Sequence, residues 1–101
     1  MAANEQQVKR YQFASSIDLS AAFSVLDIEY LTVTESRAIT IYIRSVLNIE
    51  TVEGDLENAR ILDVEVLDRS SRVGSDDPND LVETMVAQIS DVVGVDFREI
   101  S

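Results

Sequence analysis

The chain has 101 residues, 46% of them hydrophobic, and its 19 acidic and 8 basic residues give a formal net charge of −11. This length and apolar content predict a single folded domain over residues 1–101 and exclude disorder of the whole chain. The chain has no cysteine and no histidine, which excludes disulfides, thiol nucleophiles and imidazole bases and disfavours most classes of enzyme.

The strong acidity also limits the partners that the surface can attract. Phosphates bind proteins mainly through lysine and arginine, so we expect no direct contact with nucleic acid or with an anionic membrane. No stretch approaches the roughly 18 apolar residues of a membrane span, and MAANEQQVKR at the start lacks the apolar core of a signal peptide. We therefore expect the protein in the cytoplasm or in a virion.

Two periodicities overlap in residues 1–27. The segment Tyr11–Ile17 alternates apolar and polar side chains as a strand does, whereas the segment Leu19–Leu26 has its apolar residues at the spacing of a helix. We expect an arm or an edge strand over residues 1–17, followed by a short helix.

Three further segments, residues 28–34, 38–47 and 60–68, have the composition and alternation of strands. The last two are predicted to pair, and residues 48–59 between them contain turn residues and enough alternation to let both strands extend as a long hairpin. The apolar residues that share one side of these segments are assigned to the sheet core: Ile39, Ile41, Ile43, Val64 and Val66.

The clearest element is an amphipathic helix near the C-terminus. Its apolar residues recur at helical spacing and are Leu81, Val82, Met85, Val86, Ile89, Val92 and Val93. Asp77 is suited to cap the helix, Pro78 to its first position and Gly94 to its end. Residues 95–100 are predicted to add a short terminal strand.

Together these elements predict an α+β domain. Its small antiparallel sheet would have three to five strands, including the long hairpin. The C-terminal helix would pack across one face of that sheet and leave the other face to solvent.

Acidic clusters are the first candidates for chemistry. Asp76, Asp77, Asp80 and Glu83 lack the alternating ligands and central glycine of a calcium loop, and their order is typical of a helix start. The acidic residues within 50–57 indicate a solvated connection. The serines have no histidine to activate them, and the three glycines are too far apart to form a phosphate-binding loop. We predict no catalytic residue, cofactor, metal or small-molecule substrate.

Arginine is the less ordinary feature, because seven arginines accompany a single lysine. The arginines that flank the predicted strands are our candidate contact residues: Arg37, Arg44, Arg69 and Arg72. A basic strip that faces an acidic strip is what packing between identical subunits requires, so these residues favour a homo-oligomer. Charge balance within a monomer is the alternative.

The order of these features resembles the tail-terminator and related minor tail or head-to-tail joining proteins of tailed viruses. The resemblance covers ITIYI at 39–43, VEGDLENARILDVEVLDRSSR at 52–72 and DDPNDLVETMVAQISDVVG at 76–94. The N-terminal helix of that family is not clear in this sequence. The resemblance implies a ring of identical subunits that caps or joins a viral tube, contacts other structural proteins and has no catalytic residue.

The function expected from the sequence is therefore a non-enzymatic structural or assembly subunit, a virion protein at a tail or head–tail junction. Two alternatives stay open. The net charge of −11 also suits an acidic inhibitor that imitates DNA and occupies the basic cleft of a nucleic-acid-binding protein. A high acid content with little lysine also suits a generic interaction module in the cytoplasm of a salt-adapted, halophilic organism.

Overall fold

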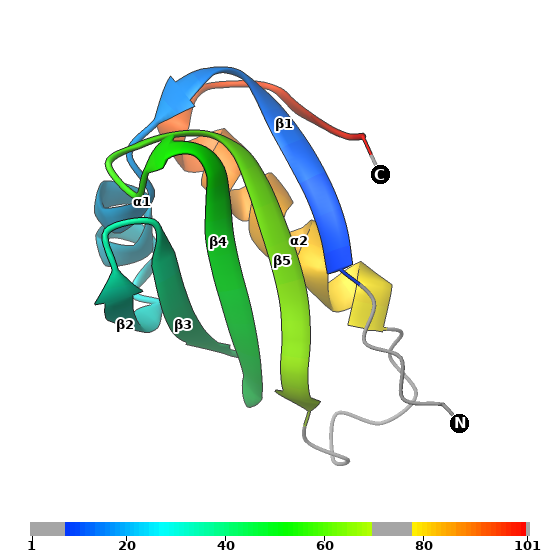
Figure 1. The fold of residues 1–101 in the computed structure, drawn as a ribbon. Coiled ribbons are helices and arrows are strands. Elements are labelled where there is room, and N and C mark those ends of the chain that lie inside the picture. The colour runs from blue at the N-terminus through cyan, green and yellow to red at the C-terminus, as the bar shows by residue number, and fades with distance from the viewer. Residues whose placement is uncertain (1–7, 70–77, 101) are drawn as a thin grey trace.

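The computed structural model describes residues 8–69 and 78–100, which form one sheet of six antiparallel strands and two helices (Figure 1). In chain order the elements are β1 (Val8–Ile17), α1 (Leu19–Leu26), β2 (Glu29–Thr34), β3 (Arg37–Tyr42), β4 (Ser45–Asp55), β5 (Asn58–Arg69), α2 (Pro78–Val93) and β6 (Phe97–Glu99). Across the sheet the strands lie in the order β2, β3, β4, β5, β1, β6. β2 and β6 are therefore its two edges.

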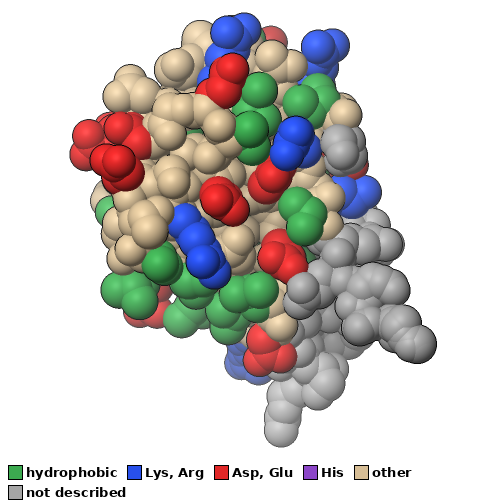
Figure 2. All heavy atoms as spheres, viewed as in Figure 1, with side chains coloured by type: hydrophobic (Ala, Val, Ile, Leu, Met, Phe, Trp, Pro, Cys, Tyr) green, Lys and Arg blue, Asp and Glu red, His purple; other side chains and the backbone are tan. Residues whose placement is uncertain are grey.

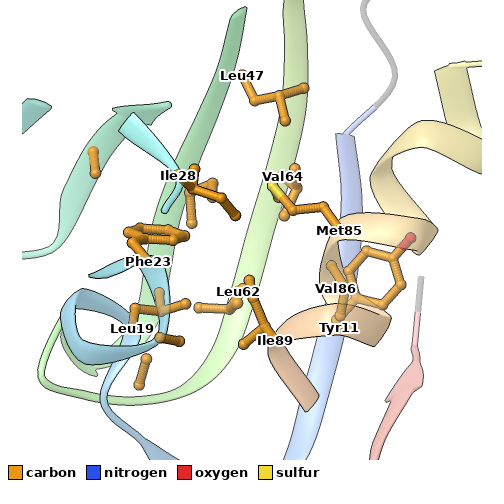
Figure 3. Close-up of a cluster of buried hydrophobic side chains, with 14 of the residues drawn as sticks. Tyr11, Leu19, Phe23, Ile28, Leu47, Leu62, Val64, Met85, Val86 and Ile89 are labelled. Carbon is orange, nitrogen blue, oxygen red and sulfur yellow. The ribbon is translucent and has the colours of Figure 1, made fainter. Parts of the chain in front are cut away.

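Both helices lie on one face of the sheet, which we call the inner face, and the opposite face is the outer face (Figure 1). Phe23 of α1, Leu62 of β5 and Met85 of α2 meet between the two layers and are fully buried (Figure 3). Burial of one such side chain contributes about 1.5–3 kcal/mol before the loss of conformational entropy is counted. The core thus lies between the helices and the central strands.

The structure confirms the predicted C-terminal helix. α2 starts at Pro78 and its apolar face is buried against the sheet, with Met85 and Ile89 fully covered. Gly94 follows with a φ of 70°, and its N–H donates to the Ser90 carbonyl at 2.9 Å. A positive φ suits glycine, which explains why the helix ends there. The proposed capping residue, Asp77, lies outside the described residues.

The strand and the short helix predicted near the N-terminus are confirmed, but the predicted place of the strand at the edge of the sheet is wrong. β1 ends at Ile17, and Asp18 caps α1 through its carboxylate, which accepts from the Ala21 N–H at 3.0 Å. β1 pairs with β5 on one side and with β6 on the other, so it is neither an arm nor an edge strand. Residues 1–7 lie outside the described residues.

The predicted fold class is wrong. The protein is mainly β, with a sheet of six strands in its described part, and is not an α+β domain with three to five strands. The main reason is residues 38–47, which form parts of two strands: the chain reverses at Ile43 and Arg44, whose φ values are 48° and 61°. Such two-residue turns are usually marked by asparagine or glycine, and this one carries neither signal.

The predicted core face of β3 is also wrong. Ala38, Thr40 and Tyr42 are buried on the inner face, whereas Ile41 and Ile43 are 50% and 53% exposed. Successive side chains of a strand alternate between faces, so a choice made on hydrophobicity alone inverts the whole strand when it fails. Val64 of β5, in contrast, is fully buried as predicted, and Val66 is partly buried against the core.

Candidate protein interface

One half of the outer face carries paired charges. The strand register places Arg37 opposite Glu50, Glu50 opposite Asp63, and Asp63 opposite Arg10. The Arg10 guanidinium donates to both carboxylate oxygens of Asp63, at 2.7 and 2.9 Å, and this hydrogen-bonded carboxylate raises the pKa of Arg10. Figure 2 shows acidic and basic side chains alternating near the middle of this face. Arg10 and Asp63 thus form an ion pair within the monomer, and the row as a whole carries both signs of charge.

The other half of the outer face, over β2 and β3, is mainly apolar, with Glu29 and Arg37 as its charged residues. Leu31 lies directly opposite Ile39 in the ladder, and Ile41 lies opposite Val46. Leu31 is 68% exposed. We call Leu31, Ile39, Ile41 and Ile43 the apolar patch. Figure 2 shows hydrophobic side chains gathered at the lower left of the view, over β2 and β3.

A shallow open hollow of about 580 Å³ lies against this patch. It is lined by Ile28, Glu29, Tyr30, Leu31, Ile39 and Ile41. An open, apolar depression of this kind on an exposed face suits contact with another protein better than enclosure of a small polar substrate.

The β2 edge continues the exposed surface. Every residue of β2 is exposed, and within the described part of the chain β2 pairs with β3 alone. Natural sheets usually protect a free edge with lysine, proline or inward-pointing charge. The only charged residue of β2 is Glu29, at its start. The edge is therefore left open to pairing with a further strand.

The turn between β3 and β4 adds an unusual backbone feature at the end of the patch. Ile43 has a φ of 48°, which is costly for a β-branched side chain, and its side chain still points to solvent with 53% exposed. Arg44 follows in the same conformation and is exposed as well. The turn thus presents an apolar and a cationic side chain beside Ile41.

The four arginines predicted as contact residues do not form one strip. Arg37 and Arg44 flank opposite ends of β3, and the Arg37 Nε donates to the Asn48 Oδ1 at 2.6 Å. The backbone of Arg69 lies opposite Ser45, close along the ladder to Arg44, but its side chain is outside the described residues. Arg72 also lies outside them. Arg37 lies two residues before Ile39 on the outer face and Arg44 directly follows Ile43, so these two arginines border the apolar patch at its two ends.

The exposed patch itself was missed by the sequence reasoning, which assigned its isoleucines to the core. A usable signal was present in residues 29–34, where Tyr30 and Leu31 are adjacent and Val33 follows. Apolar residues on both sides of one strand need cover on both sides or remain exposed. Only the position of the strand at the edge decides between these outcomes.

A second hollow, of about 280 Å³, lies near the opposite end of the sheet beside β1 and β6. Arg60 and Arg98 both line it, but so does the acidic residue Asp96. The Arg60 Nε donates to the Phe13 carbonyl at 3.4 Å. The hollow therefore presents both signs of charge and does not define an anion site.

Residues 8–69 and 78–100 contain no group of three acidic side chains placed to hold a metal ion. Neither helix in these ranges is long and apolar enough to cross a membrane. The exposed edge and the apolar patch remain the surface with the clearest chemical character.

No protein-family model, curated protein or solved structure matches the chain. The functional inference therefore rests on the residues of the β2 edge and the apolar patch.

Proposed function

We propose that the protein is a non-enzymatic structural subunit that assembles with copies of itself through the β2 edge and the apolar patch. The observation that supports this most directly is the exposure of all six residues of β2, with one charged side chain among them, in a chain of net charge −11. A surface with this little charge is the part of the molecule where two copies approach each other with the least repulsion.

The energetics favour association at this surface. Burial of Leu31, Ile41 and Ile43 removes apolar area from water, at about 25 cal/mol per Å². Strand addition would also pair backbone groups that β2 leaves open at the edge. A domain of this size buries a modest share of its own surface, so contacts with neighbours add to its stability.

The setting in a virion is a further part of the proposal and rests on the sequence resemblance. That resemblance implies a ring of identical subunits at a tail or head–tail junction, in contact with other structural proteins. Assembly needs complementary surfaces and no reaction centre, which agrees with a chain without cysteine or histidine.

The DNA-mimic alternative receives less support from the surface. A mimic needs rows of unpaired carboxylates that stand in for phosphates. On the outer face, Arg10 binds Asp63 through two hydrogen bonds, and Arg37 lies opposite Glu50. The two acidic residues Glu50 and Asp63 therefore have an arginine on either side and do not continue into a longer row of carboxylates.

Two matched variants test the proposal. Leu31 and Val25 are both 68% exposed, the first on β2 and the second on α1, away from the patch. Leu31→Lys and Val25→Lys change the net charge equally, so a difference between them reports the location alone. Sedimentation velocity from micromolar to millimolar protein, in dilute and in molar salt, gives the mass.

We expect the wild type and Val25→Lys to associate, more strongly in molar salt because salt screens their mutual repulsion. Leu31→Lys should weaken association by at least about tenfold, because it would bury an unpaired charge in the contact. A wild type that stays monomeric at every concentration and salt level would refute the proposal. Equal losses in the two variants would place the contact elsewhere.

A further inference from the structure

We infer that the first assembly step is a two-fold dimer in which β2 pairs antiparallel with β2 of a second copy, with Leu31 on the symmetry axis. This inference rests on the proposed function and specifies its partner strand, symmetry and register. The two six-stranded sheets would join into one continuous sheet, with the helices of both copies on the same side.

The two edges of the sheet favour this symmetric contact over a head-to-tail one. β2 offers six residues, whereas β6 offers only the three residues Phe97–Glu99. Arg98 and Glu99 are exposed on β6, and Glu99 already forms an ion pair with Lys9, with the Nζ and Oε2 atoms 3.1 Å apart. A β2–β6 contact would therefore form a shorter ladder next to charged side chains, while a β2–β2 contact uses the longer and less charged edge twice.

Strand geometry restricts the register to a few choices. In an antiparallel pair, residues directly opposite each other point to the same face of the sheet. A two-fold axis perpendicular to the sheet therefore passes midway between one residue and the same residue of the second copy. It does not pass between two residues that are neighbours in sequence. The two axis positions closest to the middle of β2 are Leu31 and Thr32.

Charge selects between these two positions. An axis at Thr32 places Glu29 opposite Glu35 of the second copy, and symmetry repeats this repulsion at the other end of the contact. An axis at Leu31 places Glu29 opposite Val33 of the second copy, so Glu29, the charged residue of β2, has no acidic partner. The acidic residues that this register would align, Asp27 and Glu35, both lie outside β2, and Asp27 is the C-cap of α1. The axis at Leu31 also lies in the stretch where β2 pairs regularly with β3, whereas the register shifts between Thr32 and Thr34.

This register aligns the apolar patches of the two copies. Ile39 lies opposite Leu31 within one chain, so the outer face would carry the row Ile39, Leu31, Leu31, Ile39 across the axis. Each leucine gains an apolar neighbour on the side where it now contacts solvent. The contact closes on itself, so a larger ring would need a second, different interface on each dimer.

Cysteine cross-linking tests the register directly, because the natural chain has no cysteine. Directly opposite residues of antiparallel strands have Cα atoms about 4.5–5.5 Å apart, which is within the range that a disulfide spans. Under mild oxidation Leu31→Cys should form a covalent dimer in high yield. Val25→Cys, which is equally exposed on α1, and Val33→Cys, which would face Glu29, should remain largely uncross-linked.

The outcomes separate the inference from the proposed function. If the wild type associates in sedimentation but Leu31→Cys fails to cross-link, or Val33→Cys cross-links instead, the inferred register is wrong and the proposed function stands. If the wild type does not associate at all, the proposed function fails first.

A mixing experiment tests the symmetry without relying on oxidation. Leu31→Lys and Leu31→Glu should each be monomeric when alone, because each would place two like charges on the axis. An equimolar mixture should form a heterodimer at least about tenfold tighter than either homodimer. In a head-to-tail contact Leu31 faces a different residue, so mixing would restore nothing, and that result would overturn the two-fold arrangement. Circular dichroism of each variant confirms that the monomers are folded.

Discussion

The two halves of the sheet differ in how completely the chain covers them. Around β5 and β1, α2 packs on the inner face, the Arg10–Asp63 pair satisfies charges on the outer face, and the short strand β6 borders the sheet. Around β2 and β3 the outer face is mainly apolar, and the edge has no neighbouring strand among the described residues. We call the half around β5 and β1 the finished half, because the chain itself covers it, and the half around β2 and β3 the unfinished half. The unfinished half is the part that another chain can complete, which is the basis of the proposed assembly.

The largest effect should follow from damage to the finished half. Met85 is fully buried between α2 and the sheet, so Met85→Asp places an unpaired charge in the core. We expect a loss of at least about 4 kcal/mol in the free energy of unfolding, enough to unfold the domain. Urea titration followed by circular dichroism measures the loss. Leu31→Lys on the unfinished half is the control and should change that free energy little at a protein concentration at which the wild type is monomeric. A folded Met85→Asp domain would show that the two halves do not differ in this way.

High pH should also act on the finished half. Burial of the Tyr11 ring raises its pKa to about 12, helped by the negative charges of Glu99 and Glu83. The folded state therefore holds this proton more tightly than the unfolded state, in which the pKa is about 10. The resulting stability is complete below pH 10 and is lost as the pH rises from about 10 to about 12, with a total of up to about 3 kcal/mol.

Urea titrations at a series of pH values, with absorbance of the phenolate as a second signal, measure this loss. Tyr11→Phe should show a shallower decline of stability above pH 10 than the wild type. Burial also raises the pKa of Tyr42, so some decline should remain in the variant. An identical pH dependence in both proteins would exclude the assigned role of Tyr11.

The smallest expected effect concerns the turn beside the apolar patch. Replacing Ile43 and Arg44 together by asparagine and glycine supplies the residues that a turn with two positive φ values favours. We expect the monomer to gain about 1–2 kcal/mol of stability, because the strain at both positions is relieved. The same change removes two exposed side chains next to Ile41, so association should weaken while stability rises.

Thermal unfolding and sedimentation of the double variant measure the two effects separately. Arg44→Glu alone keeps the strained turn, and it should weaken association without stabilising the monomer. If the double variant is both more stable and fully associated, the turn is strained for a reason other than assembly.

The parts of the fold that followed from the sequence are those with local signals. α2 has helical periodicity, a proline at its first position and a terminal glycine, and α1 has apolar residues at helical spacing. Each of these signals acts within a few residues, so it does not depend on the rest of the chain. β2, β5 and β6 were likewise found from their own composition.

The parts of the fold that were predicted wrongly from the sequence depend on residues that are distant in the chain. Residues 38–47 contain a turn at Ile43 and Arg44 that neither residue favours by itself, so the surrounding strands impose it. The exposure of Ile41 depends on which face the helices cover, and the openness of Leu31 depends on β2 lying at the edge. The candidate interface was therefore mistaken for core, because hydrophobicity alone does not distinguish a buried side from one that awaits a partner.

The position of β1 has a consequence for how the chain folds. β1 is made early in synthesis, yet its two neighbours, β5 and β6, come late in the chain. The meander from β2 to β5 is complete before Phe97–Glu99 leaves the ribosome, and until then one side of β1 has no strand beside it. Such non-local pairing slows folding. Until Phe97 is in place, the rings of Tyr11 and Phe13 lack the aromatic neighbour that they contact in the folded protein. Chaperone binding during synthesis should therefore concentrate in that interval.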